Sequence, residues 1–331
     1  MLARQNIKTD FIAKVNALAS QGRAFLFVID FAMKNPLLFP ANEIPEDISF
    51  QLPGVNSIGT SESCKTFTFN LSAPDFNTYK KAFNLVQNEI GHGNTYLLNL
   101  TFKSKIETNL SLKEIYQFSK AKYKLYFRDE FTVFSPECFV KIEDGVISSY
   151  PMKGTIDATI PDAERKLLED EKELAEHHTI VDLIRNDLSM VAEDVKVDQF
   201  RYIEKVKTHK GELLQMSSKI SGQLPENYAS NLGEIVLKLL PAGSITGAPK
   251  PKTVEIIERV ENYNRDFYTG IFGYFDGKNL DSAVMIRFIE KENDQLYFKS
   301  GGGITSMSDT RKEYEELIQK IYVPIHRNHK S

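Results

Sequence analysis

Apolar residues follow two different periods along the 331 residues of the chain, and segments of the two kinds alternate. In "KTFTFNLS", Phe67, Phe69 and Leu71 recur at every second position, which is the spacing of a strand with one buried face. In "PDFNTYKKAFNLVQNEIGHG" the apolar side chains instead follow a helical spacing that stops at Gly91. The chain therefore contains both strands and helices from an early point.

The remaining segments extend this alternation to the C-terminus. "YKLYFRDEFTVFSPECFVKIEDGVISSYPMKG" predicts successive strands that turn at Asp129-Glu130 and Asp144-Gly145. Residues 161–191 lack internal Gly and Pro and predict a long helical region, and "SDTRKEYEELIQKIY" predicts a closing helix. Hairpin-connected strands interspersed with helices predict an α+β fold with large antiparallel sheets.

Charge and cysteine content narrow the class of protein. The 41 basic and 45 acidic residues give a net charge of −4, the wrong sign for a nucleic-acid binder that neutralises phosphates, so we expect no nucleic-acid partner. Cys64 and Cys138 lie far apart and outside any C-x-x-C pattern, which predicts a reducing, cytoplasmic location. No segment approaches the roughly 18 consecutive apolar residues of a membrane span, so we expect a soluble protein with no membrane partner.

Two pairs of glutamates have the spacing of one helix face. Glu173 and Glu176 lie three residues apart in "EKELAEHH", and Glu313 and Glu316 repeat this spacing in "RKEYEELI". Each pair alone is typical of a solvated helix face. Four carboxylates brought together would instead require a cation, and hard oxygen ligands without Cys or His favour Mg²⁺.

Arg287 lies in "DSAVMIRFIE", which is apolar at both alternating sets of positions and predicts a buried strand. A buried guanidinium needs an anionic partner, which is either an internal Asp or Glu or a substrate carboxylate. The loops "PAGSITGAPK" and "SGGGIT" are either structural turns or places where the backbone approaches an anionic ligand. "DLIRNDL" offers helix caps and internal ion pairs, or further site residues.

Taken together these motifs resemble one family. "SPECFV", "PMKGT", "EHHTIVDLIRNDL", "GSITGAPK", "YTGIFGY", "IRF", "SGGGIT" and "EYEE" occur in the order found in the chorismate-utilising enzymes, which include anthranilate synthase component I. The resemblance implies a β-sandwich core with helices packed outside. It implies a catalytic domain over residues 74–328, preceded by a shortened N-terminal segment over residues 1–73 that joins the same fold.

"PMKGT" distinguishes members of this family, since anthranilate synthases carry alanine where Lys153 stands and aminodeoxychorismate synthases carry lysine. The resemblance therefore implies amination of chorismate by ammonia at C4, for the synthesis of 4-aminobenzoate and folate. Lys153 would attack C2 as a neutral amine while Glu137 protonates the departing C4 hydroxyl. Burial or a nearby Mg²⁺ would lower the pKa of the lysine.

The resemblance also implies a set of binding residues. Mg²⁺ would be bound by Glu173, Glu176, Glu313 and Glu316, and would hold the ring carboxylate of chorismate. The other carboxylate and the polar lining would be contacted by Thr155, Ser244, Tyr268, Arg287, Gly301, Gly302 and Gly303. Neither cysteine has the context of a glutaminase nucleophile, so a separate glutamine amidotransferase subunit is the expected source of ammonia.

Two positions depart from the family pattern. Gln215 in "LLQMSSKI" stands where many relatives have a histidine, so we assign no acid or base there. Leu97 stands where isochorismate-forming members carry a water-activating lysine, which argues against that reaction. Two alternatives stay open: an anthranilate synthase component I, which Lys153 argues against, and a non-catalytic chorismate-binding subunit.

Overall fold

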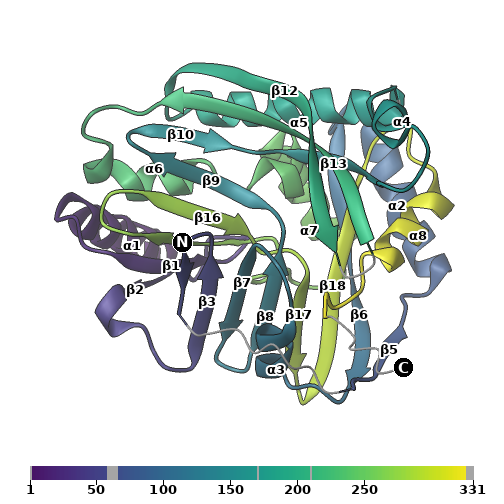
Figure 1. Cartoon of the computed structure of the whole chain (residues 1–331), viewed down its shortest axis with the longest axis horizontal. Helices are drawn as coiled ribbons and strands as arrows, with labels where there is room; N and C mark the ends of the chain where they lie inside the picture. The colour runs from purple at the N-terminus through teal and green to yellow at the C-terminus, as the bar shows by residue number, and fades with distance from the viewer. Residues whose placement is uncertain (1, 58–65, 170, 209–210, 326–331) are drawn as a thin grey trace. The chain divides into compact units, whose positions relative to one another are not determined.

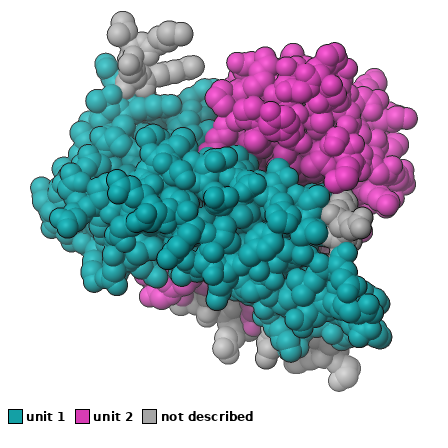
Figure 2. Space-filling view, turned by 90° about the horizontal axis from the view of Figure 1, so that it is seen from above, with its two compact units in different colours: residues 1–44, 137–244, 270–284 teal, residues 45–136, 245–269, 285–331 magenta. Residues whose placement is uncertain are grey.

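The computed structural model describes residues 2–57, 66–169, 171–208 and 211–325, which form two compact units (Figure 2). Unit 1 comprises residues 1–44, 137–244 and 270–284, and unit 2 comprises residues 45–136, 245–269 and 285–331. The chain therefore passes between the units several times. The predicted division into residues 1–73 and 74–328 stays a prediction.

Unit 1 is built on an antiparallel sheet of nine strands within the described residues (Figure 1). Both faces of β1 are covered, because all five of its residues are buried. The order is β11 (Met152–Asp157), β13 (Gly211–Gln223), β10 (Val146–Ser149), β9 (Cys138–Glu143), β16 (Leu280–Val284), β15 (Ile271–Phe275), β1 (Phe25–Ile29) and β2 (Leu37–Pro40), and β12 (Glu193–Thr208) pairs with β13.

The helices of unit 1 pack against this sheet and against each other. The described helices are α1 (Leu2–Ser20), α4 (Ala163–Glu169), α5 (Glu171–Ser189) and α6 (Leu232–Lys238), with short 3₁₀ turns at Ala41–Glu43, Tyr228–Asn231 and Gly243–Ile245. Helix α5 packs against β11, β12 and β13, and α4 packs against β11 and β13. These contacts place the polar face of α5 beside the end of β11.

Unit 2 has a second antiparallel sheet, again of nine strands where the chain is described. The order is β14 (Gly247–Ala248), β6 (Leu97–Thr108), β18 (Gln295–Ile304), β17 (Phe288–Glu292), β8 (Phe131–Ser135), β7 (Tyr123–Phe127), β3 (Ile48–Leu52) and β4 (Val55–Asn56), and β5 (Phe69–Ser72) pairs with β6. The helices are α2 (Phe76–Gly91), α3 (Leu112–Phe118), α7 (Lys250–Val260) and α8 (Thr310–Gln319).

The predicted α+β fold with large antiparallel sheets is confirmed, and the local signals explain several boundaries. Helix α2 begins after Asp75, whose carboxylate accepts a hydrogen bond from the amide of Thr78 at 2.8 Å, and it ends at Gly91 as predicted. Helix α3 begins with a capping box between Ser111 and Glu114.

One predicted element differs from the structure. The single strand predicted through "DSAVMIRFIE" is wrong, because β16 ends at Val284 and β17 begins at Phe288. Between them Arg287 adopts a φ of +53°, which no strand allows. The predicted helical region 161–191 is helical where it is described, over α4 and α5. Within the described residues, no helix is long and apolar enough to cross a membrane.

Candidate active site

Lys153 lies on a β-bulge of unit 1. Strand β11 pairs Lys153 with Met216 and Thr155 with Gln215 of β13, so the register shifts at the glycine between them. Gly154 has a φ of +71°, and a Cβ there would lie 2.8 Å from Leu167 Cδ1 and 3.2 Å from Glu173 Oε2. Only glycine fits this conformation beside α4 and α5, and a bulge of this kind re-aims the neighbouring side chain.

Helix α5 carries its two glutamates toward this bulge. Glu176 Oε2 lies 3.1 Å from Lys153 Nζ, and the two side chains are 10% and 26% exposed. Glu173 Oε2 lies beside Gly154 on the same side. The pair therefore does not occupy a solvated helix face, which is the alternative interpretation of its spacing. The side chain of Thr155 lies outside the described residues, so its predicted role stays a prediction.

His177, which sequence reasoning missed, fastens α5 to the sheet next to these glutamates. Its ring is fully buried, and a 2.6 Å hydrogen bond joins Nε2 and Ser218 Oγ of β13. Burial, together with the positive charge of Arg201, lowers the pKa of His177 to about 4. A neutral imidazole therefore holds the helix at neutral pH. The sequence shows a histidine next to Glu176, but it does not indicate the partner of this histidine, Ser218, which lies 41 residues away.

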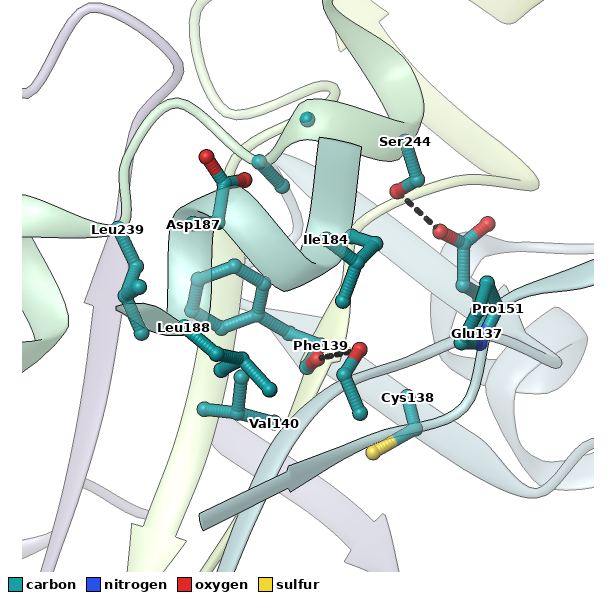
Figure 3. Close-up of a pocket in the computed structure, with 13 residues that line it drawn as sticks. Glu137, Cys138, Phe139, Val140, Pro151, Ile184, Asp187, Leu188, Leu239 and Ser244 are labelled. Atoms are coloured by element: carbon teal, nitrogen blue, oxygen red, sulfur yellow. Dashed lines mark hydrogen bonds between the residues drawn. The ribbon is translucent and has the colours of Figure 1, made fainter. Parts of the chain in front are cut away.

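Glu137 and Ser244 share a pocket in unit 1 (Figure 3). Ser244 Oγ donates a hydrogen bond to Glu137 Oε1 at one end of the pocket. Its apolar walls include Phe139, Ile184 and Leu188. The role of Glu137 as proton donor stays a prediction.

The motif "DLIRNDL" divides between two roles. Arg185 Nη1 pairs with Asp182 Oδ1 at 3.1 Å on the exposed side of α5, as the ion-pair interpretation predicts. Asp187 is buried and lines the pocket (Figure 3). A Cβ on Gly243 would lie 2.8 Å from Asp187 Oδ2, so the loop "PAGSITG" approaches α5 closely at this glycine.

Arg287, in unit 2, has a guanidinium that could bind an anion. Its Nε is buried and has no hydrogen-bond partner among the described residues. Among the described residues no ion pair joins Arg287 to an acidic side chain, and its Cζ lies 5.6 Å from the ring centre of Tyr322. The two predicted partners were an internal carboxylate and a substrate carboxylate, and this geometry favours the substrate.

Tyr268 lies close to Arg287 and is 3% exposed. Burial raises the pKa of its hydroxyl, and the positive charges of Arg265 and Arg287 oppose that rise. The phenol therefore stays protonated and can donate to an anion. Unit 2 thus brings together the two residues predicted to bind the same carboxylate.

The triple glycine Gly301–Gly303 lies in β18, paired with Thr101, Leu100 and Asn99 of β6. A Cβ on Gly301 would lie 2.5 Å from Leu100 O, so glycine there is required by the close approach of the two strands. A Cβ on Gly302 would instead point toward Glu313 and Glu316 of α8, at 3.6 Å and 4.0 Å. The glycines therefore open a space beside the second glutamate pair.

Helix α8 presents this second pair from unit 2. Glu313 is 4% exposed and accepts a 2.8 Å hydrogen bond from Ser308 Oγ. Glu316 Oε1 lies 2.7 Å from Lys320 Nζ. Their combined negative charge adds to the effect of burial in raising the pKa of Tyr79. The pair thus forms a negatively charged site beside a buried phenol.

The donor sets fit a hard divalent cation. Within the described residues, neither unit gathers three or more His, Cys, Asp or Glu side chains that could hold a metal ion alone. Each unit instead offers one pair of carboxylates, of which Glu313 is buried and Glu316 is about half exposed in unit 2, and Mg²⁺ binds through one or two carboxylates together with waters and an anionic substrate. The assignment of all four glutamates to Mg²⁺ stays a prediction.

A buried ion pair in unit 2, also missed from the sequence, supports these elements. Arg265 Nη2 lies 2.7 Å from Glu261 Oε1, and Arg265 donates to the carbonyls of Asn99 and Ile245 at 2.6 Å and 3.1 Å. Glu261 accepts from the amide and hydroxyl of Thr101. Asn99 and Thr101 are the residues that pair with Gly303 and Gly301, so this ion pair fixes the strand beside the triple glycine.

The two positions that depart from the family pattern are both within sheets. Gln215 is half-buried in β13, opposite Thr155 and Glu204. Leu97 is 5% exposed at the start of β6, where it pairs with Ala248 of β14. Neither position supplies a group that could activate water.

Unit 1 thus carries Lys153, Glu137 and one glutamate pair, and unit 2 carries Arg287, Tyr268 and the other pair. A family model described as chorismate binding enzyme matches residues 51–326. The chain belongs to this family of chorismate binding enzymes, as its motifs predict.

Three relatives show how widely the likeness extends. An uncharacterized PabA-like protein of Haemophilus influenzae is 51% identical over 322 residues, 97% of this chain and 98% of that protein. Aminodeoxychorismate synthase component 1 of Salmonella typhimurium is 32% identical over 264 residues, 75% of this chain and 57% of that protein. The structure of the menaquinone-specific isochorismate synthase of Escherichia coli has a TM-score of 0.68 at 14% identity, covering 94% of this chain and 80% of that one, which supports the shared fold.

Proposed function

We propose that this chain is the chorismate-aminating subunit of an aminodeoxychorismate synthase, which converts chorismate and ammonia to 4-amino-4-deoxychorismate and water. The observation that carries the proposal is Lys153 on its bulge, 3.1 Å from Glu176. A surface lysine would not require the glycine conformation that aims it at α5. The family resemblance and the aminodeoxychorismate synthase relative support the same activity.

In the proposed reaction Lys153 acts as the nucleophile. Its neutral amine attacks C2 of chorismate, the two ring double bonds shift, and the C4 hydroxyl leaves as water after accepting a proton from Glu137. Ammonia then attacks C4, the double bonds shift back, and the Lys153–C2 bond breaks to release the neutral amine. The new C4 ammonium gives a proton back to the Glu137 carboxylate. Ser244, hydrogen-bonded to Glu137, holds the carboxyl group in place.

The remaining residues bind and orient chorismate. Arg287 and Tyr268 would bind the enolpyruvyl carboxylate, assisted by the backbone amides of Gly301, Gly302 and Gly303, and Thr155 would contribute to the polar lining. Glu173, Glu176, Glu313 and Glu316 would hold Mg²⁺, which when bound neutralises the ring carboxylate and fixes its position. Ammonia would come from a separate glutamine amidotransferase subunit, in the cytoplasm.

One assay separates this proposal from its alternatives. The purified chain is incubated with chorismate, Mg²⁺ and an ammonium salt, followed by an aminodeoxychorismate lyase, and the aromatic product is identified. We expect 4-aminobenzoate. Anthranilate would show an anthranilate synthase, and no turnover at any ammonia concentration would favour a non-catalytic chorismate-binding subunit.

A second experiment tests the covalent step. Intact-mass spectrometry after incubation with chorismate and Mg²⁺, without ammonia, should show the protein carrying chorismate less one water. Lys153→Ala should lose this adduct, whereas Lys219→Ala, a change of a partly exposed lysine on neighbouring β13, should keep it. An adduct that persists in Lys153→Ala would exclude this lysine as the nucleophile.

A further inference from the structure

Both glutamate pairs hold a lysine ammonium of their own unit. In unit 1, Lys153 Nζ lies 3.1 Å from Glu176 Oε2. In unit 2, Lys320 Nζ lies 2.7 Å from Glu316 Oε1. The carboxylates that would bind a divalent cation are thus partly neutralised by the chain itself.

Specific interactions fix the position of Lys320. It is the C-cap residue of α8, and its ammonium also donates to Gly301 O at 3.0 Å. A Cβ on Gly302 would lie 3.7 Å from Lys320 Nζ, 3.6 Å from Glu313 Oε2 and 4.0 Å from Glu316 Oε1. The ammonium and both carboxylates therefore border the same space.

The charges explain why an ammonium lies there. Two carboxylates three residues apart on one helix repel each other, and Glu313 is 4% exposed, so its charge is poorly hydrated. One ammonium lowers this repulsion. It uses oxygen atoms that a hard divalent cation would also use, and lysine, a point charge on a flexible stem, can withdraw when such a cation arrives.

We propose that Lys320 is an internal counter-ion of the Glu313–Glu316 pair, which a divalent cation must displace from Glu316, and that Lys153 is the corresponding counter-ion of Glu173 and Glu176. The lysines thereby weaken cation binding and keep the empty site stable. The Lys153 side chain is released from Glu176, and becomes available to substrate, only when the cation is present. This inference rests on the proposed function, because it takes the glutamates as cation ligands.

The test measures cation binding directly, with Mn²⁺ as the probe and its free concentration followed by electron paramagnetic resonance. Lys320→Met should bind Mn²⁺ on the order of tenfold more tightly than the wild type, because a positive charge next to the ligands is gone. Lys320→Gln, which keeps a donor for Gly301 O, should show the same gain. Lys153→Met should likewise retain and tighten binding.

Matched lysines control for overall charge. Lys312→Met changes an exposed lysine of α8, and Lys166→Met one of α4, and neither should alter the Mn²⁺ affinity by more than about twofold. Without metal, Lys320→Met should unfold at a lower temperature than the wild type, and saturating Mn²⁺ should remove this difference.

The outcomes distinguish this inference from the proposed function. Unchanged or weaker Mn²⁺ binding in both Lys320 variants would overturn the counter-ion role while leaving the cation site intact. If the wild type binds no Mn²⁺, or if Glu316→Gln binds it as tightly as the wild type, the assignment of these glutamates as ligands fails, and the counter-ion role fails with it.

Discussion

Arg265 and Glu261 form an ion pair that water does not reach: Nη2 lies 2.7 Å from Oε1, and the side chains are 2% and 1% exposed. In unit 2 this pair holds groups beside predicted substrate residues. They include the carbonyl of Asn99, which pairs with Gly303, and the hydroxyl of Thr269, next to Tyr268. The pair therefore positions binding residues without contacting substrate.

This position predicts the effect of changing one partner. Arg265→Met leaves the Glu261 carboxylate buried without its cation and should lower the free energy of unfolding by about 3–5 kcal/mol. Glu261→Met with Arg265→Met removes both charges and should recover most of that loss. The double variant should still show a raised KM for chorismate, because β6 is no longer held beside Gly301. Urea denaturation and steady-state kinetics measure the two effects, and a wild-type KM in the double variant would refute the positioning role.

Gly154→Ala tests the bulge that aims Lys153. The new methyl group would lie 2.8 Å from Leu167 Cδ1, and alanine would be strained at a φ of +71°. We expect a loss of stability of about 2–4 kcal/mol and at least a tenfold lower kcat, because Lys153 is displaced. Gly54→Ala is the control, since Gly54 has a φ of +80° but open space around it. A similar effect on kcat from both changes would disprove the link between the bulge and the lysine.

Arg287→Gly tests the anion-binding guanidinium without harming the fold. The φ of +53° at this position suits glycine, and no hydrogen bond of Arg287 Nε is lost, since that atom has no partner among the described residues. The free energy of unfolding should therefore stay within about 1 kcal/mol of the wild type. Chorismate binding, followed by calorimetry, should weaken on the order of 100-fold, and Arg287→Lys should recover only part of it. Wild-type affinity in Arg287→Gly would rule out this residue as a substrate ligand.

Local patterns sufficed for part of the site. The spacing of Glu173 and Glu176 predicts a shared helix face, and the structure places that face beside Lys153, at the end of the segment predicted to form successive strands. These relationships depend on residues close together in sequence. Motif order then added the family, which the match over residues 51–326 confirms.

Other relationships depend on distant parts of the chain and leave no periodic signal. The anchor of Glu261 is Thr101, which is 160 residues away, and the anchor of His177 is Ser218, which is 41 residues away. Arg287 misled the strand pattern for a different reason. Its flanking apolar residues belong to two strands, β16 and β17. The alternation of apolar residues therefore continues in the sequence although the first strand ends and a second one begins.

Lys124 makes the stability of unit 2 depend on pH. Its side chain is 1% exposed, its ammonium donates to the carbonyls of Tyr116 and Ser119, and burial lowers its pKa from 10.5 to about 8. Below pH 8 the lysine is protonated in the folded and the unfolded chain. Between pH 8 and 10.5 only the unfolded chain retains the proton, so this lysine makes the folded state more stable as pH rises.

Lys124→Met should remove that contribution. From pH 7 to pH 10, the stability of the wild type relative to the variant should increase by about 2 kcal/mol, measured by urea denaturation at each pH. Lys122→Met, a change of an exposed lysine just before β7, should show no such trend. If the difference between wild type and Lys124→Met is constant over this pH range, the buried amine keeps its proton in the folded chain, held by the two carbonyls at the end of α3.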